Sequence, residues 1–153
     1  MPIISGASGI GVLPVSWLTG FNLTATVNQG TVGNPGSYVL DTVVGTDIAI
    51  DAGGAMVNLL TVGLYLVQAS LSLTPAHAST SLLIEITDSD VIAEEAVMQN
   101  ASGPLIPAVT NRVSTFKWIR TTDVFANFVV QVSAGGGSQA ETGVLGFDAM
   151  FLG

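Results

Sequence analysis

The side chains with the clearest potential for chemistry are four acidic residues between positions 88 and 95. Asp88, Asp90, Glu94 and Glu95 carry the carboxylates that a hard cation such as calcium prefers. A calcium loop of the helical-hand type also needs oxygen ligands at alternating positions and a glycine at its sixth position, and Val91–Ala93 interrupt that pattern. We therefore interpret the acids as charges of a turn and a strand edge. We predict no metal ligands, while a non-standard calcium site stays an open alternative.

The chain lacks the residues that nucleophilic catalysis and cofactor binding need. The single histidine, His77, stands in a Pro-Ala-His-Ala context, and no cysteine is present, so neither a Ser-His-Asp nor a Cys-His set can be placed. The glycine-rich stretch 4–11 is similar in composition to a dinucleotide-binding loop. Such a loop must be followed by a helix, however, and Val12-Leu13-Pro14 follows it here. We predict that the protein is not an enzyme and has no catalytic residue, no cofactor-binding residue and no cofactor.

Composition limits the partners. The 153 residues fit one domain, of which 48% are apolar and only 9% are charged. So few charged side chains leave much apolar surface exposed on a monomer, and we infer that other subunits cover it. The net charge of −8 opposes binding to nucleic acid and to anionic membranes, so we predict neither as a partner.

The segment Gly63–Leu73 is the longest clean alternation of apolar and polar residues. One face carries Tyr65, Val67, Ala69, Leu71 and Leu73, as a half-buried antiparallel strand requires. The other face turns polar at Gln68, but it begins with Leu64 and Leu66. One end of this strand is therefore apolar on both sides, and we expect both sides to be covered.

Similar alternation predicts several more strands and no helix. Strands are expected at 21–32, 37–44, 48–50, 81–87, 91–98, 109–120, 124–132 and 142–152, with Phe21, Leu23, Ala25 and Val27 on one face of the first. Arg112 and Lys117 should lie on opposite faces of their strand. The fold expected is all-β, a two-sheet antiparallel sandwich formed by residues 21–153. The residues expected to pack the core and the contacts between subunits are Tyr65, Val67, Leu71, Phe125, Phe128, Phe147 and Phe151.

The first twenty residues are apolar, uncharged and interrupted by proline and glycine. They lack the basic start of a signal peptide and the uninterrupted apolar run of a membrane helix. We predict an extended arm over 1–20 that docks on a neighbouring chain or folds back on its own domain. Its expected anchors are Ile3, Ile4, Ile10, Val12, Leu13, Val15 and Trp17.

Three spaced motifs resemble the trimeric jelly rolls typified by tumour necrosis factor and the complement globular head. Gly63-Leu64-Tyr65-Leu66-Val67 resembles their Gly-x-Tyr-x-Phe strand, and Val113–Val124 resembles their strand that leads into Gly-Asp-x-Val. Phe147–Leu152 resembles their closing strand, Phe-x-Gly-Phe-Leu-Leu. Thr122 and Ala149 replace two glycines of the family pattern, and the matching order covers residues 55–153.

The resemblance implies a jelly roll that forms a homotrimer around a threefold axis. Lacking cysteine and a collagen repeat, the chain is most similar to bacteriophage capsid decoration and head-fibre proteins. We therefore expect a structural virion protein on the capsid exterior, a decoration (cementing) protein at capsid threefold sites. Its partner would be the major capsid protein, contacted through the arm. The alternative is the receptor-binding tip of a phage fibre, which contacts a cell-surface glycan or protein through its loops, where Tyr38 and Trp118 are the aromatic candidates.

Overall fold

The computed structural model describes residues 16–29, 31, 33, 36–77, 81–88, 98–102, 106–122, 126–135 and 140–153. These residues form ten strands, and no helix among them is long and apolar enough to cross a membrane. The strands are β1 (Ser16–Gln29), β2 (Val39–Val44), β3 (Ile48–Ile50), β4 (Val57–Leu59), β5 (Gly63–Leu73), β6 (Ser81–Asp88), β7 (Met98–Ser102), β8 (Asn111–Thr121), β9 (Ala126–Gly135) and β10 (Glu141–Phe151).

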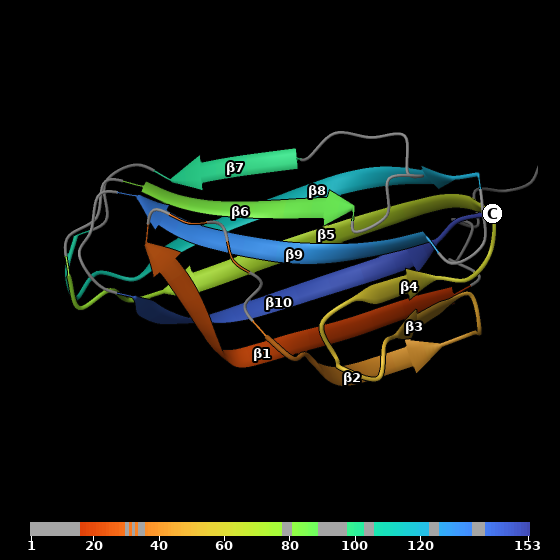
Figure 1. The fold of residues 1–153 in the computed structure, drawn as a ribbon, viewed down its shortest axis with the longest axis horizontal. Helices are drawn as coiled ribbons and strands as arrows, with labels where there is room; N and C mark the ends of the chain where they lie inside the picture. Colours follow the sequence, from red (N-terminus) through yellow and green to blue (C-terminus); the bar gives the residue numbers. More distant parts are fainter. Residues whose placement is uncertain are drawn as a thin grey trace, which may run out of the picture.

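Two antiparallel layers pack face to face, as expected of a jelly-roll sandwich (Figure 1). We call the layer ordered β2-β1-β10-β5-β8 the β5 sheet, and the layer ordered β3-β4-β9-β6-β7 the β9 sheet. β1 belongs to both layers, because its last residues, Asn28 and Gln29, pair in parallel with Ser133 and Ala134 of β9. The all-β prediction is confirmed.

Strand bounds follow the sequence most closely where alternation is cleanest. β5 spans Gly63–Leu73 as predicted, with every odd position from Tyr65 to Leu73 buried. The partner predicted for β6 at 91–98 lies outside the described residues except for Met98, which begins β7 and pairs with Ile86 of β6. The three-residue β3 lies at 48–50 as predicted, while β4, of the same length, was not predicted.

A β-bulge in β1 overturns the predicted face of Phe21 and Leu23. Between Asn22 and Ala25 the register against β10 shifts by one residue, so Phe21 and Leu23 face outward while Ala25 faces the core. The side chain of Asn22 causes the local turn, because its Oδ1 accepts a hydrogen bond from the Thr24 N–H at 2.9 Å.

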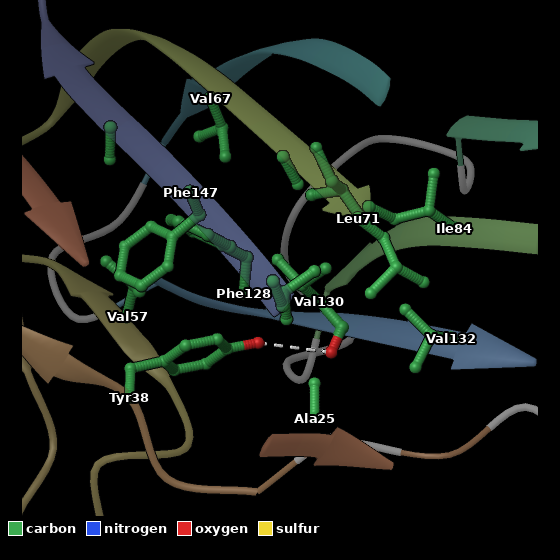
Figure 2. Packing of buried hydrophobic residues seen from close by; sticks show 14 of the residues in the cluster. Ala25, Tyr38, Val57, Val67, Leu71, Ile84, Phe128, Val130, Val132 and Phe147 are labelled. Carbon is green, nitrogen blue, oxygen red and sulfur yellow. Dashed lines mark hydrogen bonds between the residues drawn. The ribbon is translucent and has the colours of Figure 1, made fainter. Parts of the chain in front are cut away.

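The core lies between the two sheets and is made of their inward alternating residues (Figure 2). Phe147 of β10 is central, with its ring 4.7 Å from Tyr38 and 6.4 Å from Phe128, both edge to face. Tyr38 was expected in an exposed loop, but it is buried, and its hydroxyl donates to the Val130 carbonyl at 3.3 Å. The six described residues that the sequence assigned to packing, Tyr65, Val67, Leu71, Phe128, Phe147 and Phe151, are all buried within one chain.

β1 begins at Ser16, so residues 16–20 form part of the sandwich. The Ser16 hydroxyl donates to the Asp47 carboxylate, and Thr61 Oγ1 donates to the same carboxylate at 2.6 Å. These two hydrogen bonds, with that of Ser16 the larger influence, lower the pKa of Asp47. The start of β1 is thereby tied to both loops that flank β3 and β4.

His77 and Glu141 close the end of the sandwich where β5 and β10 meet. The Glu141 carboxylate accepts from the Ala76 N–H at 3.0 Å, and from the His77 N–H and Nδ1, each at 2.9 Å. Burial alone would raise the pKa of Glu141, but the hydrogen bonds from Ala76 and His77 outweigh it and lower the pKa below 4.5. His77 therefore stabilises the connection between β5 and β6.

Glu141→Gln is expected to lower the free energy of unfolding by about 1.5–3 kcal/mol at pH 7, because the charge is lost and an amide NH2 group, which cannot accept, replaces one of the two acceptor oxygens. The native pKa of Glu141 lies below its unfolded value of 4.5, so its contribution is present above pH 4.5 and disappears as the pH falls through the native pKa. Denaturant unfolding from pH 7 to pH 3 tests this. A constant difference between wild type and variant across that range would contradict it.

Candidate assembly face

The outward side of the β5 sheet carries a straight row of large apolar side chains. Strand registers place Val44 beside Trp17, Trp17 beside Met150, Met150 beside Leu66, and Leu66 beside Trp118. Directly paired residues of neighbouring strands project on the same side, so these five side chains, from five strands, form one stripe. We call these five residues the tryptophan row.

The tryptophan row is unlike an ordinary solvent-facing sheet surface. Trp118 is 50% exposed and Val44 38% exposed, while Trp17, Leu66 and Met150 are half-buried among their neighbours. Phe116, two residues before Trp118 on the same side of β8, is 54% exposed. Within the described part of the chain, nothing covers the exposed parts of these side chains. A continuous apolar stripe of this kind indicates a protein contact surface.

The rest of this face is more polar, although Phe21, Phe116 and Val144 also point outward on it. The next row pairs Thr19 with Asp148, and Thr19 Oγ1 donates to Asp148 Oδ1 at 2.9 Å. Beyond it, Gly146, Ser70 and Ser114 lie side by side on β10, β5 and β8. The apolar half of the face therefore lies at the end of the sheet that carries the C-terminus, and the small polar residues lie at the other end (Figure 1).

The predicted site residues divide into three groups. Trp17 lies on the outward side of the β5 sheet, which we call the assembly face. It belongs to β1 and not to a free arm. The remaining arm anchors, Ile3, Ile4, Ile10, Val12, Leu13 and Val15, lie outside the described residues, as does Phe125. So do three of the four candidate calcium ligands, while Asp88 ends β6, and the described residues contain no group of three potential metal ligands.

Sequence reasoning found one part of this face and missed the rest. Leu64 and Leu66 were expected to need cover on the second side of β5, and both are half-buried there. Met150 and Phe116 were not assigned to it, and Trp118, which the strand predicted at 109–120 contains, was considered only as a loop aromatic of the fibre-tip alternative. The available signal was the same alternation: Phe116 and Trp118 are two apart, and Lys117 between them is buried on the inner side, opposite Arg112 as predicted.

Comparisons with known proteins agree with this architecture. No protein-family model and no curated protein sequence matches the chain. The fold is similar to the PRD1 vertex protein P5, with a TM-score of 0.65 and 13% identity over 92% of this chain and 99% of that one. It is also similar to the globular domain of zebrafish complement 1qA (TM-score 0.64, 9% identity, 90% and 98% covered) and to murine APRIL (0.55, 12%, 87% and 97%). The chain therefore has the complement and tumour necrosis factor type of jelly-roll fold.

Proposed function

We propose that the protein is a structural virion component that assembles as a homotrimer through the tryptophan row. The observation that carries the virion role is the similarity of fold to the PRD1 vertex protein P5, which extends over nearly the full length of both chains. The threefold arrangement follows the resemblance to the trimeric jelly rolls, and the complement 1qA and APRIL folds support it. Within the virion, we propose a capsid decoration protein on the exterior.

The energetics of the assembly face favour association with further copies of the chain. A standard interface buries about 800 Å² on each partner, and its centre is enriched in Trp, Met and aromatic residues. The tryptophan row has this composition, and it is flanked along the strands by polar residues such as Asp148 and Arg120. Burial of the row against another subunit also explains why the chain has so few charged residues.

The proposed contact with the major capsid protein is made by the apolar segment before Ser16. Its six large apolar anchors are worth about 1.5–3 kcal/mol each when fully buried, which offsets a large part of the cost of ordering the backbone, about 1–2 kcal/mol per residue. Since Ser16 is fixed to Asp47, the segment starts from a rigid point of the sandwich. A short arm on a fixed base reaches only subunits adjacent to the trimer, as cementing requires.

Deleting residues 2–15 is expected to release the protein from purified particles while leaving the trimer intact. The deletion keeps Ser16, so the hydrogen bonds to Asp47 remain. Retention on particles in a sedimentation assay, compared between the deletion and the full chain, measures the effect. As a control, exchanging Ile3, Ile10 and Val12 for leucine keeps the apolar character and should retain binding.

One outcome would contradict the docking of the arm, and another would contradict the capsid role itself. Equal retention of the deletion and the full chain would show that the arm does not hold the protein on the capsid. Binding of the purified trimer to whole cells but not to empty capsids would favour the receptor-binding tip of a fibre.

A further inference from the structure

The three basic residues of the chain all lie on one strand. Arg112, Lys117 and Arg120 belong to β8, which forms one edge of the β5 sheet. Lys117 is buried on the inner side, whereas Arg112 and Arg120 are exposed on the outward side, one near each end of the strand. Within the described residues, no carboxylate forms an ion pair with either arginine. This edge of the assembly face is therefore basic in a chain whose net charge is −8.

Two carboxylates at the surface of the β5 sheet lie away from β8. Asp41 is exposed on β2, the strand at the other edge, where it is the extra residue of a bulge between Leu40 and Thr42. Asp148 lies on β10 at the centre of the sheet, and its Oδ1 accepts from Thr19 Oγ1 at 2.9 Å. A carboxylate accepts further hydrogen bonds beyond one. The assembly face therefore carries opposite charges on its two sides.

A single chain cannot pair these charges with one another. Neighbouring strands are about 4.8 Å apart, so β2 lies roughly 19 Å from β8 across the sheet. Asp148 is two strands from β8, and its row meets β8 at Phe116, which is four residues, or about 14 Å, from each arginine. A second copy of the chain supplies charges of the opposite sign on the same face. Unlike edges favour a head-to-tail contact, the kind that closes into a ring.

We propose that the subunits associate head to tail, with Arg112 and Arg120 on β8 of one subunit against the Asp41 and Asp148 side of the next. This inference rests on the proposed homotrimer and assigns the two sides of its contact. The tryptophan row supplies the apolar centre, and the arginine–carboxylate pairs at its rim select which edges meet. Complementary charges at the rim of an interface mainly speed association and exclude other alignments.

The test measures the rate of trimer assembly by light scattering after full-length protein is diluted from denaturant into about 0.01 M salt, where charges act over about 30 Å. The first variant carries Arg112→Glu and Arg120→Glu, the second carries Asp41→Lys and Asp148→Lys, and the third carries all four exchanges. The first two bring like charges together, so each should assemble at least about 10-fold more slowly than the wild type. The third restores opposite charges across the contact and should assemble within about threefold of the wild-type rate.

The set of variants separates this contact from two other effects of charge. Each exchange changes the net charge by two units, so it becomes −12 in the first variant, −4 in the second and −8 again in the third. General repulsion between subunits would slow the first variant and speed the second. Charges that only protect exposed edge strands would serve with either sign, so no variant would differ. Either result overturns the proposal, as does a third variant that assembles as slowly as the first two.

A matched control and the final masses complete the test. Val109→Glu adds a charge on the β7–β8 connection and should change the assembly rate less than about twofold. Circular dichroism checks the fold of each variant, and Asp41→Lys alone replaces the second variant if lysine at half-buried Asp148 perturbs it. A monomeric wild type would overturn the proposed trimer and this contact together. A trimeric wild type whose first two variants assemble at the wild-type rate would overturn this contact alone.

Discussion

Phe147→Ala is expected to cost about 3–5 kcal/mol of unfolding free energy, a large share of the stability of a domain of this size. Phe147 is 2% exposed and contacts the rings of Tyr38 and Phe128. The cavity left by its removal has little means of collapsing, since Gly20 opposite has no side chain to move into it. Denaturant unfolding at one fixed protein concentration measures the loss.

Gly20 supplies an internal check on the Phe147 prediction. A Cβ at Gly20 would collide with the Phe147 ring, so Gly20→Ala alone should be destabilising. In the Phe147→Ala background the ring is absent, so Gly20→Ala should lower the free energy of unfolding only slightly. Leu23→Ala, at a side chain that is 65% exposed, serves as the control and should change stability by less than about 0.5 kcal/mol. Additive effects of Gly20 and Phe147 would contradict the packing described.

Trp118→Glu is expected to convert the trimer to a folded monomer. The wild-type protein should have a mass of about 47 kDa in solution, three times the 15.6 kDa of one chain. A carboxylate at the β8 end of the apolar row would have to be desolvated without a partner, while the large contact area of the tryptophan is lost. Light scattering after gel filtration should show the single-chain mass, with an unchanged β-sheet circular dichroism spectrum.

Controls separate this effect from a general response to added charge. Val109→Glu places the same charge at an exposed apolar residue of the β7–β8 connection, away from the tryptophan row, and should stay trimeric. Trp118→Phe keeps an aromatic side chain in the row and should also assemble. A trimeric Trp118→Glu protein would show that the subunits associate through another surface.

The sequence predicted those parts of the fold that depend on one strand at a time. Gly63–Leu73 was located to the residue, because its buried and exposed positions alternate without interruption. The bulge in β1 was not predicted, because it depends on a hydrogen bond from the Thr24 N–H to the Asn22 side chain, a contact that simple alternation does not encode. One inserted residue was enough to assign Phe21 and Leu23 to the wrong face.

The assembly face was harder to predict, because it is built across strands. Trp17, Leu66, Trp118 and Met150 are distant in the chain and form one row only through the order β1-β10-β5-β8. That order depends on which strands pair, and composition and spacing do not determine it.

The position of β1 has a mechanical consequence. Ser16 enters the sandwich at the end of a long antiparallel ladder with β10, and β1 is also held by β2 and, at its far end, by β9. A pull on the chain before Ser16 that is directed along β1 loads the hydrogen bonds of the ladder in shear, so that they must break together. A tether attached here resists tension far better than one attached to a strand that peels open bond by bond.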